Sequence, residues 1–479
     1  MPLYIERARA RVMLEMLAGK AFSSKNREEN ELLIQERSLR RQIEELSVKE
    51  EGIGLEGPPG LEGESLEGKE IAKFLNKGEL LRAKYKTILK KIERLNPELA
   101  SLVTINPIQA SEIQELLDGE TVLLEYFIGT ENQYLFLVTS QKILIFPLRA
   151  DGRTIFEKIR EFRRRAVEGI TLDRLLTKVY ERPLIDLHEI LMKPVMEELS
   201  GKKHLVIVPH GMLHYLPFQA LLSREKKYLI ESFTISYLPS ASVLKYARAK
   251  NKGNRSDLFA VGNPTTGLPP LPAAEVEVKE ISTIFEKNMV LTGEQATKTA
   301  VKDYGTKYDL MLLSTHGEMI ESNPLKSNLR FAISKKDDGK LTVSEIFDLE
   351  IKANLVTLSA CETGLVKGEA GDFPQGDDLV GLSRAFIHAG APSVVASLWK
   401  VSDDSTVQIM KNFYQNMRTL SKAEALRKAQ LDLMRSTVRF TVTRAGGGVI
   451  QPPSKGTEEV VECSHPFFWA PFILLGDWR

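Results

Sequence analysis

The sequence predicts an α/β protein: a mostly parallel sheet flanked by helices and preceded by an α-helical hairpin. Three observations predict this fold class. Apolar residues recur three and four positions apart in the first 100 residues, continuous apolar runs typical of buried strands follow, and such runs alternate with helical segments after residue 257. A chain of 479 residues is too long for one ordinary core, so we expect two or three domains.

The composition excludes several classes of protein. With 65 basic and 64 acidic residues, the net charge of +1 gives no electrostatic reason to expect nucleic-acid binding. Two cysteines argue against a disulfide-stapled secreted protein and exclude a four-cysteine zinc site. No apolar stretch approaches the length of a membrane span, and the N-terminus lacks the apolar core of a signal peptide. We therefore expect a soluble, cytoplasmic protein that needs no cofactor.

Residues 1–110 are predicted to form a coiled-coil-like helical hairpin. Two series of apolar residues have helical spacing, and between them residues 51–68 contain six glycines and two prolines, which predicts a flexible loop. The first series is Leu32, Leu39, Ile43 and Leu46, and the second is Leu81, Tyr85, Ile88, Ile92 and Leu95.

Short runs of β-branched and aromatic residues after residue 120 predict an antiparallel meander of strands. Helices are expected at about 153–168 and 175–200, and the apolar run His204–Pro209 predicts a strand buried on both faces. The expected strands of the meander are Thr121–Ile128, Tyr134–Thr139 and Lys142–Phe146.

Strands and helices alternate from Asp257 onward, which predicts parallel strands with helical crossovers. A Gly- and Pro-rich stretch, Arg439–Cys463, predicts a mobile surface loop before the final apolar segment Pro466–Leu475. The expected strands are Asp257–Gly262, Asp309–Ser314, Leu355–Ser359 and Ser393–Leu398, and the expected helices are Ala274–Phe285, Thr297–Tyr304, Leu379–Ala389 and Asp403–Met417.

A short internal similarity suggests two related α/β halves. Leu205–Gly211 reads LVIVPHG and Met311–Gly317 reads MLLSTHG, so each is an apolar strand that ends in His-Gly.

His316 and Cys361 each follow a predicted buried strand and lie 45 residues apart. If these strands are parallel neighbours, both side chains emerge at one edge of the sheet. The imidazole could then take the thiol proton, and backbone N–H groups of Gly317 and Cys361 could face a developing oxyanion. A cysteine at a strand end is also often a small buried hydrophobe, and His-Gly is often only a turn, so spacing alone leaves both interpretations open.

The motifs around these two residues resemble those of a known protein family. SACETG around Cys361 and STHGE around His316 resemble the active-site blocks of CHAT peptidases, bacterial relatives of caspases and separases. Further blocks over roughly residues 115–479 also resemble that family: VPHGMLHYLPFQALL (208–222), YLPSASVL (237–244), GNP (262–264), GDDLVGLSRAFIHAGAPSVVASLWKVSD (376–403) and HPFFWAPFILLGDW (465–478).

The resemblance implies a cysteine endopeptidase with a protein substrate, His316 as general base and Cys361 as nucleophile. It also implies two caspase-like halves, an inactive one at 111–255 and a protease half at 256–479. Residues 4–20 resemble the last helices before CHAT domains in tetratricopeptide-repeat proteins. Region 1–110 would then be a remnant of such helices on which a protein regulator acts.

The remaining histidines and the second cysteine fit structural roles. His210 and His214 have no cysteine in their half and are expected to satisfy local hydrogen bonds. Cys463 and His465 are interpreted as a bystander and a packing residue, and His188 and His388 as ordinary helical side chains.

Substrate selection is less defined. Asp377 and Asp378 end an acidic segment and could select a basic residue, or could instead cap the following helix, which we favour. Trp399 could supply an apolar pocket wall. The sequence bears on two other functions as well. A non-catalytic scaffold stays open, whereas a nucleotide-binding protein is disfavoured because no phosphate-loop motif occurs.

Overall fold

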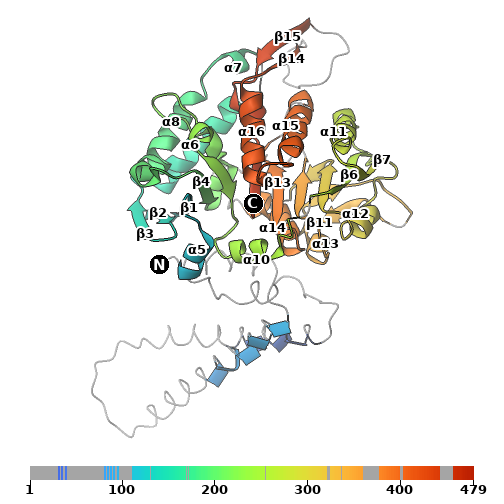
Figure 1. Ribbon diagram of the computed structural model, residues 1–479, viewed down its shortest axis with the longest axis horizontal. Coiled ribbons are helices and arrows are strands. Elements are labelled where there is room, and N and C mark those ends of the chain that lie inside the picture. Colours follow the sequence, from blue (N-terminus) through green and yellow to red (C-terminus); the bar gives the residue numbers. More distant parts are fainter. Residues whose placement is uncertain are drawn as a thin grey trace. The chain divides into compact units, whose positions relative to one another are not determined.

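The computed structural model describes residues 110–479 except 130, 169, 171, 254, 321–323, 336, 360–376, 400–402 and 443–456, together with scattered positions between 28 and 42 and between 80 and 95 (Figure 1). The chain divides into two compact units, Leu3–Pro107 and Ile108–Arg479. In the first unit every described position is helical, as predicted, and Leu32, Leu81 and Ile88 are buried. The predicted loop at 51–68 lies outside the described residues.

The second unit is built on one large sheet with the strand order β3-β2-β1-β4-β5-β16-β13-β12-β8-β6-β7. The strands of its first part are β1 (Thr121–Ile128), β2 (Gln133–Val138), β3 (Ile143–Pro147), β4 (His204–Val208) and β5 (Thr234–Tyr237). Those of its second part are β6 (Asp257–Pro264), β7 (Lys287–Gly293), β8 (Leu310–Ser314), β12 (Leu355–Leu358) and β13 (Ser393–Ser397), and β16 (Phe472–Gly476) lies between the two parts.

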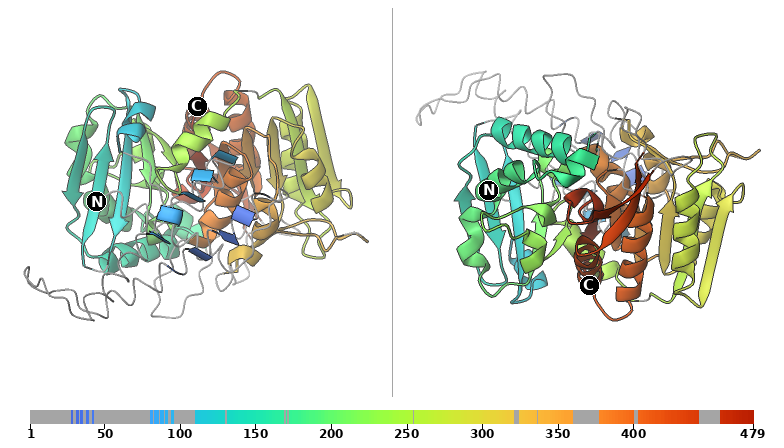
Figure 2. Two further views of the ribbon diagram at one scale, coloured as in Figure 1. Left: turned by 90° about the horizontal axis from the view of Figure 1, so that it is seen from below. Right: turned by 90° about the horizontal axis from the view of Figure 1, so that it is seen from above.

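Apart from β2 and β3 at one edge, the sheet consists of two groups of parallel strands, and these groups run in opposite directions. Strands β1, β4, β5 and β16 are parallel to one another, as are β13, β12, β8, β6 and β7, whereas β16 and β13 pair antiparallel. Figure 2 shows the blue-green strands at one end, the yellow strands at the other and the red C-terminal segment between them. The carboxyl ends of the two groups therefore lie at opposite edges.

At the junction Gly476 permits a close approach of the two groups. Its φ is +95°, and a Cβ at this position would lie 2.2 Å from the carbonyl oxygen of Pro392. A side chain fits neither that backbone conformation nor that space.

Helices cover the sheet, and on one side α11 packs against α15 and α15 against α16 (Figure 1). The α-helices are α5 (Ala110–Leu116), α6 (Gly152–Ala166), α7 (Leu172–Leu176), α8 (Glu181–Leu191), α9 (Leu229–Ser232), α10 (Val243–Lys250), α11 (Pro272–Ser282), α12 (Lys298–Tyr304), α13 (Val343–Phe347), α14 (Asp377–His388), α15 (Asp403–Asn416), α16 (Lys422–Met434) and α17 (Pro466–Trp469). Short 3-10 turns are η1 (Lys193–Leu199), η2 (Gly211–Tyr215), η3 (Phe218–Ala220) and η4 (Pro324–Lys326).

The predicted fold class, a mostly parallel sheet flanked by helices, is confirmed, and so is the antiparallel meander β1–β2–β3. The prediction of one loop over Arg439–Cys463 is wrong at its two ends. There β14 (Thr437–Val442) and β15 (Thr457–Glu462) pair antiparallel, because β-branched residues on both sides of the Gly- and Pro-rich stretch have the alternation of a hairpin. Strands from before and after residue 255 belong to the same sheet. The division into two halves at that position stays a prediction.

Candidate functional site

Strands β8 and β12 are parallel neighbours, as the predicted Cys–His pair requires. Leu310 lies beside Leu355 and Leu313 beside Leu358, a constant offset of 45 positions. The ladder extends one residue further, because the Ser359 N–H donates to the Leu313 carbonyl at 3.0 Å. Both strands therefore end in step at one edge of the sheet. Cys361, two residues beyond Ser359, lies outside the described residues.

His316 is partly buried, and a backbone carbonyl fixes its ring. Its Nε2 lies 2.8 Å from the carbonyl oxygen of Pro269, in the loop between β6 and α11. A carbonyl oxygen only accepts hydrogen bonds, so Nε2 carries the proton. In the neutral ring Nδ1 then holds the lone pair, and none of the described residues forms a hydrogen bond with it. This is the arrangement that a general base needs.

Gly317 opens a small three-stranded sheet made of β9 (Gly317–Glu318), β10 (Asn328–Arg330) and β11 (Lys340–Thr342). The His316 carbonyl accepts from the Arg330 N–H at 2.8 Å, and Gly317 is paired with Leu329. Hydrogen-bonded and non-bonded pairs alternate along an antiparallel ladder, so the Gly317–Leu329 pair is a non-bonded one. The Gly317 N–H therefore points away from β10.

Glu318, the last residue of the STHGE motif, holds this small sheet together. Its carboxylate accepts from Arg330 Nη2 at 2.6 Å and from Asn328 Nδ2 at 3.1 Å. The hydrogen bond from Asn328 is the main reason that the pKa of Glu318 lies below its ordinary value of 4.5. Sequence reasoning gave Glu318 no role. The signal available was an acidic residue directly after His-Gly.

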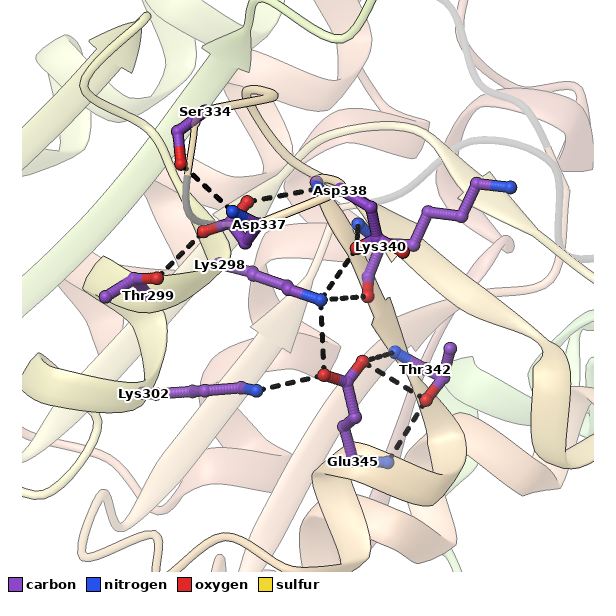
Figure 3. Close-up of polar contacts among 10 residues, drawn as sticks. Lys298, Thr299, Lys302, Ser334, Asp337, Asp338, Lys340, Thr342 and Glu345 are labelled. Carbon is purple, nitrogen blue, oxygen red and sulfur yellow. Dashed lines mark hydrogen bonds and ion pairs between the residues drawn. The ribbon is translucent and has the colours of Figure 1, made fainter.

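A network around Lys298 fastens the small sheet to α12 (Figure 3). The Lys298 ammonium donates to Asp338 at 2.7 Å, to Glu345 at 3.2 Å and to the Lys340 carbonyl at 3.2 Å. Lys302 adds a second bond to Glu345 at 3.0 Å. Burial alone would lower the pKa of Lys298, but the two carboxylates raise it overall. The strands beside His316 and Gly317 are thus held by an ion network.

Polar pairs on the strands behind this edge are buried as well. The Ser314 hydroxyl, at the end of β8, donates to the Glu277 carboxylate of α11. Tyr414 of α15 donates to Thr357 of β12 at 2.7 Å, and burial raises the pKa of its phenol. These bonds tie the two strand ends to the helices that cover them.

The predicted substrate residues belong to different parts of the fold. Asp377 and Asp378 are the first two residues of α14, which suits acidic side chains at a helix start. Trp399 is 3% exposed, its indole N–H donates to the Phe467 carbonyl at 3.1 Å, and its ring packs against Phe162. Protein neighbours thus surround the indole, and the predicted pocket wall at Trp399 gains no support from the fold.

Four of the other histidines accept a hydrogen bond within the protein or are buried in it. Nδ1 of His210 accepts from the Ile128 N–H of β1 at 3.2 Å, which fits the structural role expected of His210. Nδ1 of His465 accepts from the Phe467 N–H at 3.1 Å, and burial lowers the pKa of His465 to about 3. Burial also lowers the pKa of His388 to about 4 and that of His188 by a smaller amount. Cys463 is fully buried.

A cavity of about 470 Å³ lies along α16, and none of the predicted site residues lines it. Two of its four cationic residues are in ion pairs, Lys203 with Glu120 and Lys428 with Asp432, and Arg427 donates to backbone carbonyls. Within the described parts of the chain, no group of three or more His, Cys, Asp or Glu residues could hold a metal ion. The described helices include none long and apolar enough to span a membrane.

The chain resembles several known proteins. Tetratricopeptide repeat protein 28 of Mus musculus is 26% identical over 366 residues, covering 64% of this chain and 14% of that protein, and the Homo sapiens protein is 25% identical over the same coverage. This chain thus spans about a seventh of the length of these relatives.

Solved structures with a similar arrangement include the Saccharomyces cerevisiae separase–securin complex. Its TM-score is 0.48 at 11% identity, with 93% of this chain and 37% of that chain covered. The Arg-specific cysteine proteinase gingipain R has a TM-score of 0.34 at 10% identity, with 68% and 73% covered. The CHAT domain family matches residues 181–477, more than half of the chain. The predicted resemblance to this family is therefore confirmed, and this protein belongs to the CHAT domain family.

Proposed function

We propose that this protein is a cysteine endopeptidase in which Cys361 is the nucleophile and His316 the general base. One observation carries the proposal: the offset of 45 positions between β8 and β12 equals the separation of His316 and Cys361. Counted from the paired residues Leu313 and Leu358, each is the third residue along its chain segment. Neighbouring positions of parallel strands lie about 5 Å apart, which is within reach of a thiol–imidazole contact.

The proposed reaction uses the open nitrogen of His316. Nδ1 takes the thiol proton of Cys361, and the thiolate attacks the carbonyl carbon of a peptide bond. Backbone N–H groups of Gly317 and Cys361 stabilise the negative oxygen that forms. The imidazolium returns the proton to the leaving amine, and water, activated by the same ring, hydrolyses the thioester. The Pro269 carbonyl keeps the ring oriented through both steps.

The substrate of this proposal is a protein. Asp377 and Asp378 are candidates for selecting a basic residue before the scissile bond, and their place at the start of α14 also fits a capping role. Cleavage of a peptide library by the native protein and by Asp377→Asn and Asp378→Asn separates these roles. Specificity residues would change the preferred residue, whereas caps would change only thermal stability.

The test of the proposed function combines cleavage with thiol labelling. Cys361→Ala and His316→Ala should both abolish cleavage of a protein panel while circular dichroism stays native. An electrophilic peptide probe should label Cys361 and leave buried Cys463 unmodified. Cleavage retained in Cys361→Ala would overturn the proposal. Failure of the probe to label Cys361 would favour the alternative, a non-catalytic scaffold.

A protein regulator acting on residues 1–110 is part of the proposal. The curated relatives are named for tetratricopeptide repeats, which supports an interaction role for that region. Hydrogen exchange of the amides at the ends of β8 and β12 should change when residues 1–110 are removed. Equal protection with and without them would count against coupling.

A further inference from the structure

The loop that carries the Pro269 carbonyl is closed by one side chain. Asn263, in the GNP motif at the end of β6, accepts a hydrogen bond from the Leu271 N–H through Oδ1 at 2.7 Å. Its Nδ2 donates to the Glu275 carboxylate at 3.2 Å. Leu271 precedes α11 and has no side-chain oxygen to cap that helix. Asn263 therefore fastens both ends of the segment 264–270 from the strand side.

The backbone at Asn263 is unusual as well. Its φ is +48°, and it lies where the register between β6 and β7 shifts. Asparagine adopts this left-handed conformation more readily than most residues. Gly262 beside it admits no side chain, because a Cβ there would lie 2.5 Å from Val278 and 2.6 Å from the Ala274 carbonyl. The bulge thus sends the chain out of the sheet directly above α11.

Within the loop two further devices fix the turn. The Thr266 hydroxyl accepts from the Leu268 N–H at 3.2 Å, and Gly267 has a φ of +77°. Pro269 follows, and its carbonyl accepts from His316 Nε2. Of the loop residues named here, only Pro269 forms a hydrogen bond with His316. The orientation of the His316 ring therefore depends on the conformation of the loop.

We propose that Asn263 is a positioning residue for His316: it holds the 264–270 loop so that the Pro269 carbonyl selects the Nε2–H tautomer. The inference rests on the proposed function only for its catalytic consequence. The tautomer itself is a property of this chain whether or not Cys361 reacts. Loss of the two side-chain bonds of Asn263 would let the Pro269 carbonyl move. Both tautomers of the neutral His316 imidazole would then be populated.

Nitrogen NMR of the imidazole rings tests this directly. Protein labelled with ¹⁵N in its histidine rings is observed at pH 8.5, where an ordinary imidazole is neutral, and the His316 signals are assigned by their loss in His316→Gln. The native protein should show the Nε2–H pattern for His316. Asn263→Gly, which keeps the backbone conformation and removes both side-chain bonds, should show a mixture of tautomers. An unchanged Nε2–H pattern would overturn the proposal.

A matched pair of substitutions supplies the rescue. In Asn263→Asp the carboxylate still accepts from Leu271, but it faces the Glu275 carboxylate and is repelled. Adding Glu275→Gln replaces that repulsion by an amide donor, so the double variant should recover the native pattern while Asn263→Asp alone should not. If the double variant matches Asn263→Gly instead, the bonds of Asn263 do not determine the tautomer and the proposal fails.

The control for backbone strain is Lys226, the other non-glycine residue with a positive φ among the described residues (φ 63°). Lys226→Gly should leave the His316 signals unchanged. The catalytic consequence is measured separately as the rate of Cys361 alkylation by iodoacetamide, which should fall about 10- to 100-fold in Asn263→Gly. A native Cys361 that does not react would count against the proposed function, while the tautomer pattern would still decide the role of Asn263.

Discussion

The two His-Gly turns of this protein follow similar strands and differ in what their rings do. His210 follows β4 and His316 follows β8, and because these strands run in opposite directions the two turns lie at opposite edges of the sheet. Both rings hold a lone pair on Nδ1. In His210 the Ile128 N–H occupies it, whereas in His316 no described residue bonds to it.

The backbone after each histidine differs too. Gly211 enters the 3-10 turn η2, whereas Gly317 enters the strand β9 with its N–H directed away from β10. A similar sequence pattern thus gives a structural histidine in one place and a candidate base in the other. Chemical capacity depends on which ring nitrogen the neighbouring backbone has already engaged, which a motif does not record.

Replacing the histidine of each turn by alanine should give the largest difference between the two turns. His316→Ala should reduce cleavage by about 10²- to 10⁴-fold, the usual contribution of a general base. His210→Ala should leave the cleavage rate near native and cost about 1 kcal/mol of stability, because the Ile128 N–H loses its acceptor. Steady-state cleavage and urea unfolding of both variants measure this. Comparable loss of activity in the two variants would contradict the comparison.

The junction between the two strand groups offers the next test. Gly476→Ala should destabilise the protein by about 2–5 kcal/mol, since the new Cβ meets both a positive φ and the Pro392 carbonyl. Gly201 also has a positive φ, +74°, but open space around it, so Gly201→Ala should cost only about 1–2 kcal/mol. Denaturant unfolding of the pair separates strain from collision. Equal costs would show that the junction is not tightly packed.

The two regions should also differ in their response to acid. Burial lowers the pKa of His204, at the start of β4, to about 3, while nearby Asp118 and Glu424 oppose the shift and Arg248 reinforces it. In the unfolded chain His204 is protonated below about pH 6.5, whereas in the folded protein it stays neutral. The free energy of unfolding therefore falls as the pH drops from 6.5 toward 3, by up to about 1.4 kcal/mol per pH unit.

Glu318 behaves in the other sense. Its lowered pKa contributes stability above its ordinary value of 4.5, and that stability is lost as the pH falls through the folded value. His204→Gln should therefore flatten the stability profile below pH 6.5. Glu318→Gln should lower stability by a constant amount above about pH 4.5, and its difference from the native protein should shrink as the pH falls below that value. Thermal unfolding from pH 7 to pH 3 checks both. A difference between Glu318→Gln and the native protein that is absent at pH 7 and appears only in acid would be inconsistent with this assignment.

The smallest effect is expected from two lysines. Lys298→Met removes the ammonium that joins Asp338 and Glu345, and should cost about 1–2 kcal/mol because its side chain is only 12% exposed. Lys142→Met breaks an exposed pair with Glu198 in the other region and should cost less than about 1 kcal/mol. Chemical unfolding measures the free energy of unfolding of both variants. Equal small losses would show that the Lys298 network does not stabilise the protein.

Much of this architecture was predictable because buried strands of a parallel sheet are written as continuous apolar runs. Thr121–Ile128 and His204–Val208 were expected almost to the residue, and the parallel pairing of β8 with β12 was expected from the alternation of elements. Strands β5 and β7 are not predicted by these runs, because β5 has only four residues and β7, at the edge of the sheet, contains no buried residue.

The site was predictable only where residue type carries the chemistry. Histidine and cysteine are recognised in the sequence by their side chains. The partner of His316 is a backbone carbonyl, which any residue at position 269 would provide, so the sequence does not reveal it. Trp399 illustrates the opposite case: its type suggested a pocket wall, while its place against Phe162 is decided by tertiary packing. The role of Asn263 was hidden for the same reason, since it depends on the distance to Leu271.

The position of β16 has a consequence for how the protein is made. This strand pairs with β13 on one side and β5 on the other, and it is the last of the sheet's strands to leave the ribosome. Until it emerges, the edges of β5 and β13 lack their partner, and bare strand edges invite pairing with other chains. Closing contacts as distant as Tyr237 and Leu475 is intrinsically slow. The pairing of β16 should therefore be among the last steps in forming the sheet.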